Sequence, residues 1–272
     1  MRGKRIKDGH IESALNRFLE GEHNVVLGFG SGDDGGIHHR IYKGTLDHYS
    51  LLNPVFDANG ALYLRRLFSK GLKVMLMVRP CEVRAYVELS KLTQVEREAI
   101  IAVSVDCTGT VSSKEGVSDL PADPLGLATF FAAPDAGRWA CRQCREQRGV
   151  VGDAGIRIDG KGNYWIVPYT GKGEEVLSLF EGETEEVSGD MLLHERPKPD
   201  LFATDMVAFA KDFERCVMCL NCRDMCPVCY CVDCVFHGDE YLPKGDALLN
   251  KIFRTGSTQI PQGKELFHFI RM

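Results

Sequence analysis

A run of closely spaced cysteines near the C-terminus constrains this chain more than any other feature of its sequence. Seven of the eleven cysteines lie between positions 216 and 234, and the first four follow the spacing C-x2-C-x2-C-x3-C with Pro227 directly after them. Gaps of two residues allow one tight loop to direct three thiolates toward a single [4Fe-4S] cluster, and the proline fixes the direction in which the chain leaves. Structural zinc sites normally combine two separated C-x2-C pairs, so zinc is the less favoured alternative. The predicted ligands of this run are Cys216, Cys219, Cys222 and Cys226.

Three further cysteines follow the run at once, at Cys229, Cys231 and Cys234. In proteins with two clusters, the fourth cysteine of such a run binds the other cluster, so Cys226 need not join the first three. Seven cysteines are one short of two complete cysteine-only sites, which leaves one ligand to come from elsewhere. His237 is a candidate for that ligand, although a lone histidine is more often a solvated loop residue.

The composition indicates a compartment in which thiols stay reduced. No apolar stretch follows the basic residues 1–7, so a secretory signal peptide is not expected. The longest apolar runs fall far short of the ~18 residues that a membrane-spanning helix needs. A net charge of −5 provides no basic field for nucleic acid. We therefore expect a cytoplasmic, oxygen-sensitive protein whose cysteines bind metal.

Residues 1–125 alternate strand-like and helix-like apolar patterns, which predicts an α/β domain. Strands are expected at 24–28, 73–78 and 100–105, and helices at 58–69 and 83–92. An amphipathic surface helix is expected around residues 11–20, because its apolar residues recur at helical spacing.

Two further regions are expected, over residues 126–200 and 201–272. The first contains a β-hairpin at 156–167, with its turn at Asp159-Gly160, because both flanks carry β-branched or aromatic residues. The acidic stretch 174–186 is expected to be a solvated face or loop. The last region is the ferredoxin-like cysteine-rich segment.

The remaining cysteines are Cys81, Cys107, Cys141 and Cys144. The first two each follow one of the expected strands, and in open α/β sheets sites gather at the carboxyl ends of the strands. The other two form a C-x2-C pair, so the four thiols can complete one closed site. The alternative is two buried small side chains and half of a zinc site. The spacing by itself leaves both interpretations open.

Over about residues 24–170, the sequence resembles the beta subunits of the coenzyme F420-reducing hydrogenases and related dehydrogenases. The resemblance lies in Asp34-Gly35-Gly36, Pro80-Cys81, Cys107, the pair Cys141 and Cys144, and residues 151–155 with the hairpin after them. It implies that Cys81, Cys107, Cys141 and Cys144 hold one [4Fe-4S] cluster. It also implies that Asp34, Gly35 and Gly36 lie near a bound FAD.

A formate-dehydrogenase-associated branch of these proteins is still more similar. It shares Arg-Pro-Cys-Glu-x-Arg-Ala, here at 79–85, and the cysteine run that ends in Cys-Tyr-Cys, here at 229–231. In similar proteins a second ferredoxin run follows at about the point where this sequence stops, so we expect Cys226 either to lack its usual cluster partners or to receive them from another chain.

Two stretches of the N-terminal region are interpreted as irregular structure. Residues 37–41 are more polar than the helix that similar proteins have there. His38 and His39 are expected to be exposed loop residues, and contact with a cofactor is the alternative. The glycine-rich stretch 28–32 is expected to be a flexible turn, because Asp33 replaces the third glycine of a phosphate-binding loop.

These features predict an iron–sulfur electron-transfer subunit of a multisubunit oxidoreductase, with two or three [4Fe-4S] clusters and FAD. The resemblance implies that electrons pass between a hydride carrier, such as coenzyme F420, and a partner. That partner would be a formate dehydrogenase, a hydrogenase or a heterodisulfide-reductase-like complex. Two alternatives stay open: a flavin-free adapter that only wires proteins together, and a zinc-stabilised interaction protein. No catalytic side chain is assigned.

Overall fold

The chain divides into two compact units, Met1–Lys198 and Pro199–Met272. The computed structural model describes residues 2–7, 9–33, 35–68, 70–112, 120–187, 189–194, 207, 221–230 and 253–254. The first unit holds the expected region 1–125 and almost all of the expected region 126–200.

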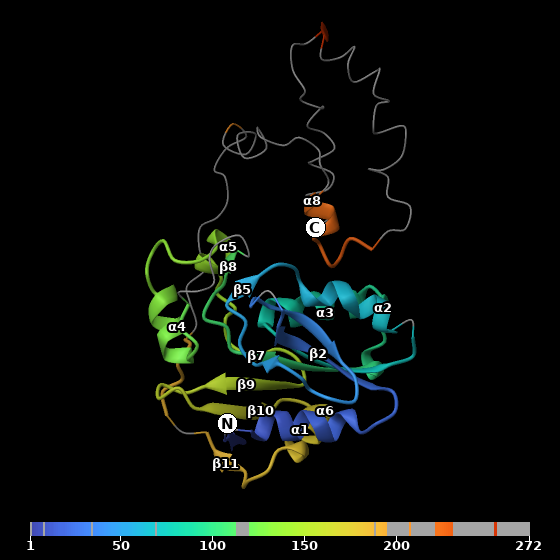
Figure 1. The fold of residues 1–272 in the computed structure, drawn as a ribbon, viewed down its shortest axis with the longest axis vertical. Helices are drawn as coiled ribbons and strands as arrows, with labels where there is room; N and C mark the ends of the chain where they lie inside the picture. The colour runs from blue at the N-terminus through green and yellow to red at the C-terminus, as the bar shows by residue number, and fades with distance from the viewer. Residues whose placement is uncertain are drawn as a thin grey trace. The chain divides into compact units, whose positions relative to one another are not determined.

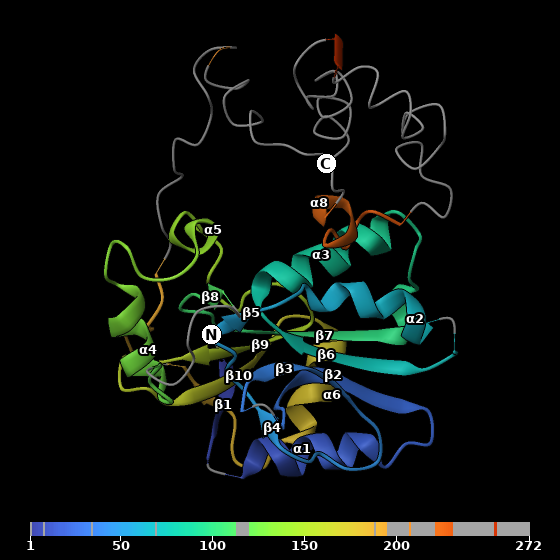
Figure 2. The same ribbon diagram turned by 45° about the horizontal axis from the view of Figure 1, so that its top comes forward.

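A nine-stranded mixed sheet forms the centre of the first unit (Figures 1 and 2). Its strands lie in the order β11-β1-β10-β9-β7-β6-β2-β3, and β4 pairs with β2. The strands are β1 (Arg2–Ile6), β2 (Asn24–Ser31), β3 (Ile37–Tyr42), β4 (Tyr49–Ser50), β6 (Lys73–Val78), β7 (Ile100–Val105), β9 (Ala154–Ile158), β10 (Tyr164–Pro168) and β11 (Glu185–Glu186). In the middle, β2, β6, β7 and β9 are parallel neighbours. Two short strands, β5 (Val55–Phe56) and β8 (Val111–Ser112), form a second, parallel pair.

Helices cover both faces of the large sheet (Figures 1 and 2). On one side lie α1 (His10–Leu19) and α6 (Gly171–Leu179), and on the other lie α2 (Leu64–Phe68) and α3 (Pro80–Lys91). The shorter helices are η1 (Gly60–Tyr63), η2 (Arg97–Ala99), α4 (Pro124–Phe131) and α5 (Trp139–Arg142). Within the described ranges, no helix is both long and apolar enough to cross a membrane.

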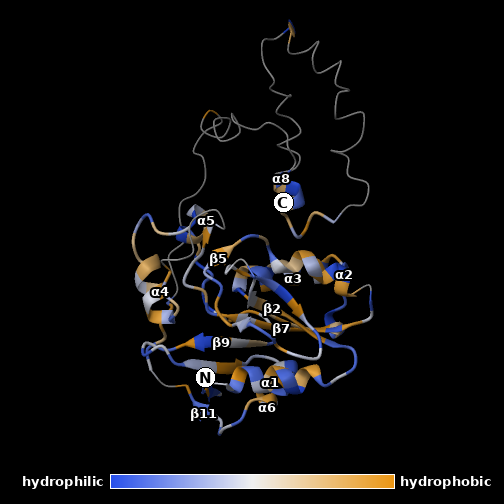
Figure 3. Cartoon of the chain, viewed as in Figure 1, coloured by the Kyte–Doolittle hydropathy of each residue, from blue (hydrophilic) through white to orange (hydrophobic). Residues whose placement is uncertain are grey.

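The middle strands are buried on both faces. In β6 only Lys73 is exposed, and every residue of β7 is buried. Strands that are covered by helices on both sides need nearly continuous apolar sequences, which these two strands have (Figure 3). The strands predicted at 73–78 and 100–105 are confirmed residue for residue.

Two amphipathic elements also follow their sequence patterns. Helix α1 buries Ile11, Ala14, Leu15, Phe18 and Leu19 against the sheet and leaves its charged residues outside. Each large side chain buried in this way contributes roughly 1.5–3 kcal/mol. The hairpin predicted at 156–167 is confirmed as β9 and β10, which pair antiparallel around a turn at Asp159.

The interpretation of residues 28–41 was wrong in two places. The stretch predicted to be a flexible turn, 28–32, lies for most of its length in β2. Its glycines are needed for close packing, because a Cβ at Gly30 would collide with the hydroxyl of Tyr42 and the backbone of His48. His38 and His39 lie in β3 and not in an exposed loop.

Candidate metal centre

Four cysteines from three segments of the first unit line one pocket of about 280 Å³. Cys81 lies in the first turn of α3, directly after β6, and Cys107 follows the end of β7. Because β6 and β7 are parallel neighbours, both thiols reach the same edge of the sheet. Cys141 lies in α5 and Cys144 follows that helix, so the C-x2-C pair adds two more sulfurs to the pocket.

The donor set matches an iron–sulfur cluster in the number and type of its ligands. Among the described residues, no three histidine, cysteine, aspartate or glutamate side chains converge closely enough to hold one metal ion. A zinc ion needs its four ligands around a single point. A [4Fe-4S] cluster is wider and is held by four thiolates that are spread around it. Four sulfurs around one pocket meet that requirement in number and in chemistry.

Two thiols of this pocket, those of Cys107 and Cys81, have raised pKa values and are neutral in the absence of metal. Burial raises the pKa of Cys107 to about 12 despite the opposing charge of Arg79, and Cys141 and Cys144 raise it further. Cys81 retains exposed surface, but the protein around its thiol removes enough hydration to raise its pKa as well. A metal must therefore displace protons from these sulfurs to bind.

Arg79 provides a fixed positive charge at the wall of the pocket. The residue is 3% exposed. Its Nε donates to Glu82 at 3.1 Å, its Nη1 donates to the carbonyl of Val55 at 3.1 Å, and its guanidinium lies 4.9 Å from the centre of the Phe29 ring. Among the described residues, nothing accepts a hydrogen bond from its buried Nη2. The charge therefore stays beside the sulfurs with one donor unused.

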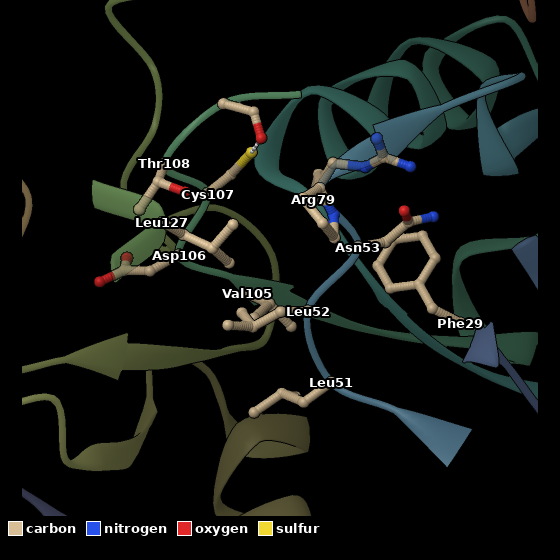
Figure 4. Close-up of a pocket in the computed structure, with 12 residues that line it drawn as sticks. Phe29, Leu51, Leu52, Asn53, Arg79, Val105, Asp106, Cys107, Thr108 and Leu127 are labelled. Atoms are coloured by element: carbon tan, nitrogen blue, oxygen red, sulfur yellow. Dashed lines mark hydrogen bonds between the residues drawn. The ribbon is translucent and has the colours of Figure 1, made fainter. Parts of the chain in front are cut away.

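A second, smaller cavity of about 20 Å³ borders Cys107 on the inner side (Figure 4). Arg79 lines both cavities, and Asn53 lies on the same side of the small cavity as the guanidinium. The Oδ1 of Asn53 accepts from the amide of Val55 at 2.8 Å, whereas its Nδ2 has no acceptor in the described part of the chain. A cavity of this size holds about one water molecule.

The Glu82 carboxylate holds Arg79 in place. Its side chain has no exposed surface and accepts four hydrogen bonds. Its Oε1 is 2.6 Å from His39 Nε2 and 2.8 Å from the amide of Gly60, and its Oε2 accepts from the amide and the Nε of Arg79. Burial by itself would raise the pKa of Glu82, but Arg79 and His39 hold it at about 2. The carboxylate is therefore a charged, fully paired anchor.

His39 extends this network toward the surface. Its side chain is 1% exposed, and its Nδ1 is 3.5 Å from Asp57 Oδ1. Burial lowers the pKa of His39, but Asp57 and Glu82 outweigh that effect and the pKa is raised. His38 is 3.3 Å from the other oxygen of Asp57 and is itself partly exposed. A line of charged and polar groups thus connects the surface with Arg79.

Asp106 fixes the segment that presents Cys107. Its side chain is fully buried. Its Oδ1 accepts from the amide of Gly149 at 2.6 Å and from Arg157 Nε at 2.9 Å, and its Oδ2 accepts from the amide of Ile158 at 2.9 Å. These contacts join the end of β7 to β9 and to the chain that precedes β9, so the position of Cys107 is set by the sheet.

The structure describes only some of the cysteines near the C-terminus that were predicted to be cluster ligands. Cys222 lies in α8 (Asn221–Asp224), and Cys226 and Cys229 follow it, with the amide of Cys229 donating to the carbonyl of Cys226 at 3.1 Å. The other predicted ligands of this segment lie outside the described residues; they are Cys216, Cys219, Cys231 and Cys234. His237 also lies outside the described residues.

The structure also describes only part of the stretch that was proposed to lie near a flavin. Asp34 lies outside the described residues. Gly35 and Gly36 belong to the turn between β2 and β3, in which the amide of Gly32 donates to the carbonyl of Gly36 at 2.8 Å. Gly35 has a φ of 76°, a left-handed conformation that suits glycine.

Sequence reasoning missed several polar residues of this site. Thr110, Asp57 and the buried role of Glu82 were not predicted. One local signal was available for Glu82, since proline at the start of a helix followed two positions later by glutamate is typical of a helix N-terminus. The contacts of Asp57 and Thr110 join segments that are distant in the sequence, so no local pattern marks them.

Comparisons with known proteins agree with the predicted resemblance. No family model matches the chain. The chain is 22% identical over 220 residues to subunit beta of F420-dependent formate dehydrogenase 1 from Methanococcus maripaludis, an alignment that covers 61% of this chain and 57% of the relative. It is 21% identical over 317 residues to the beta subunit of F420-dependent formate dehydrogenase from Methanocaldococcus jannaschii, covering 93% of this chain and 81% of the relative. The chain thus spans little more than half the length of the first relative. A chain of the F420-reducing [NiFe] hydrogenase complex from Methanosarcina barkeri superposes with a TM-score of 0.43 and 16% identity, over 65% of this chain and 76% of that one.

Proposed function

We propose that this chain, a relative of the beta subunits of F420-dependent formate dehydrogenases, is the electron-transfer subunit of a larger oxidoreductase. In this proposal the pocket of the first unit holds one [4Fe-4S] cluster on Cys81, Cys107, Cys141 and Cys144. The cysteines between positions 216 and 234 hold one or two more, and FAD lies near residues 34–36. The hydride carrier is coenzyme F420 or a similar molecule. The partner is a formate dehydrogenase, a hydrogenase or a heterodisulfide-reductase-like complex.

The observation that carries this proposal is the gathering of four cysteines around one pocket. They come from the ends of two parallel strands and from a C-x2-C pair far along the chain, so folding of the sheet is what assembles them. A cluster bound there would take up and release single electrons. The four thiolates would bind its iron atoms, and Arg79 would stabilise its negative charge. The buried walls would keep water from its inner side.

A flavin-free adapter is the second candidate function, and one observation favours it. The turn at Gly35 and Gly36 leads directly into the strand β3, not into a helix. Phosphate groups of nucleotide cofactors commonly bind at helix N-termini, and this turn does not provide one. In that case the clusters alone would connect the partner proteins.

Anaerobic purification followed by iron, sulfide, zinc and flavin analysis tests the proposal. The full-length chain is compared with a variant in which the seven cysteines between 216 and 234 are replaced by serine, which isolates the site of the first unit. We expect about four iron and four sulfide per chain in that variant. Adding Cys107→Ala to it should remove most of the iron without unfolding the protein. Zinc without sulfide would overturn the redox proposal, and sulfide without flavin would leave the adapter.

A further inference from the structure

Thr110 contacts the segment that carries two of the four cysteines at two points. It lies in the loop between β7 and β8, three residues after Cys107, and is 1% exposed. Its carbonyl accepts a hydrogen bond from the amide of Arg138 at 2.8 Å, at the start of α5. Its Oγ1 is 3.1 Å from the Sγ of Cys141. A single residue therefore ties the strand-end half of the site to the C-x2-C half.

The loops around Thr110 are packed too closely to shift freely. Gly109 and Gly137 both have positive φ values, 146° and 74°. A Cβ at either glycine would lie within 3.0 Å of the Phe131 ring. The close approach of both loops to this ring fixes the distance between Thr110 and α5.

The direction of the hydrogen bond follows from the state of the sulfur. In a free thiol either atom can be the donor. A cysteine that binds iron has lost its proton, so its sulfur can only accept. The buried Thr110 hydroxyl then has to donate, because a buried hydroxyl without a partner is costly. The bond therefore becomes stronger and more directional when the site is loaded.

We propose that Thr110 is a positioning residue that donates a hydrogen bond to the metal-bound sulfur of Cys141 and thereby raises the reduction potential of the cluster. The inference rests on the proposed function. Reduction adds one electron to the cluster, and no covalent bond of Thr110 forms or breaks. The added negative charge spreads onto the ligand sulfurs, where a donated hydrogen bond stabilises it. Removing the donor should therefore disfavour the reduced state.

The backbone contact of Thr110 and its hydroxyl can be separated by substitution. Thr110→Val removes the hydroxyl and retains both the shape and the carbonyl that accepts from Arg138. Thr110→Ser retains the hydroxyl and loses a methyl group. The matched control is Thr129→Val on α4, whose exposed hydroxyl donates to the carbonyl of Leu125 in its own helix.

The experiment is a potentiometric titration, followed by electron paramagnetic resonance, of the full-length chain with the seven C-terminal cysteines replaced by serine. We expect Thr110→Val to shift the midpoint potential to a more negative value, and Thr110→Ser and Thr129→Val to leave it near that of the parent. Unfolding of the metal-free proteins in urea measures the purely structural effect. An unchanged potential in Thr110→Val at full iron and sulfide content would overturn this inference alone. Absence of iron and sulfide from the parent itself would instead overturn the proposed function.

Discussion

His39 Nε2 lies 2.6 Å from Glu82 Oε1 at a place where the side chains of both residues are at most 1% exposed. The two residues come from an edge strand and from the first turn of a helix, 43 positions apart. A buried pair of this kind costs desolvation energy, and it persists because further donors and acceptors complete it.

Replacing His39 should be far more damaging than replacing its neighbour. His39→Leu leaves the buried Glu82 without one of its partners, and we expect the free energy of unfolding to fall by roughly 3 kcal/mol. His38→Leu is the matched control: it removes a partly exposed partner of the same Asp57 and should cost less than about 1 kcal/mol. Urea denaturation under anaerobic conditions measures both. Equal decreases in the free energy of unfolding would show that the buried pair of His39 and Glu82 stabilises the protein no more than the exposed contact of His38 does.

The stabilisation by this network should depend on pH in both directions. The pKa of His39 is raised above 6.5, so its contribution is complete below pH 6.5 and is lost as the pH rises through the raised value. Burial opposes ionisation of Asp57, but the neighbouring His39 and the hydrogen bond from the amide of Ala58 lower its pKa below 3.8. Its contribution is complete above pH 3.8 and is lost as the pH falls.

The stability difference between the parent and His39→Leu should therefore be largest between pH 3.8 and 6.5 and smaller on either side. Denaturation curves at three pH values, one within that window and one on each side, measure it. A difference that keeps growing into the alkaline range would contradict the assignment of a protonated His39.

Replacing Asp106 by asparagine should destabilise the protein, although the two side chains have nearly the same shape. Asp106→Asn puts an NH2 group among donors from Gly149, Arg157 and Ile158, and leaves the charge of the buried Arg157 unpaired. We expect a loss of about 3 kcal/mol and a lower iron content, since Cys107 is the next residue. Asp135→Asn is the control, because that carboxylate is fully exposed and its pair with Arg142 is worth little. Thermal unfolding and iron analysis check both outcomes.

Gly155 should not tolerate even a methyl group. A Cβ there would collide with the backbone carbonyl of Gly149, which is held by the contacts of Asp106 and cannot move aside cheaply. Gly155→Ala should therefore destabilise the protein by about 3 kcal/mol or more. Gly171→Ala, at the first position of α6 with open space around it, should leave stability unchanged or raise it by up to about 1 kcal/mol.

The sequence predicts the parts of this fold whose signal is local. The strands at 73–78 and 100–105 are continuous apolar runs, and α1 has a clean helical pattern. The edge strand β3 was missed because Tyr42 is the only apolar residue in it that is buried, so its sequence has the polar character of a loop. The glycines of β2 were interpreted as a turn, whereas glycine is needed there because Tyr49 packs over Gly28 and Tyr42 packs over Gly30. Those tyrosines are distant in the sequence, so no local pattern reveals the contact.

For the site too, the sequence predicted only the residues that a local pattern marks. The strand ends and the C-x2-C pair pointed to the four cysteines that line one pocket but left a shared site open, and only the family resemblance implied one. The groups that surround them were not visible in the sequence, because Glu82 meets His39 and Thr110 meets Cys141 only after the sheet has formed.

The division of the pocket between strand ends and a small helix means that its sulfurs are held in two different ways. Cys81 and Cys107 are positioned by the pairing of β6 with β7. Cys141 stands on α5, a helix of four residues that is too short to be stable by itself. The sheet therefore fixes two of the four sulfurs directly, whereas the position of Cys141 depends on the contacts that hold α5 against the rest of the first unit.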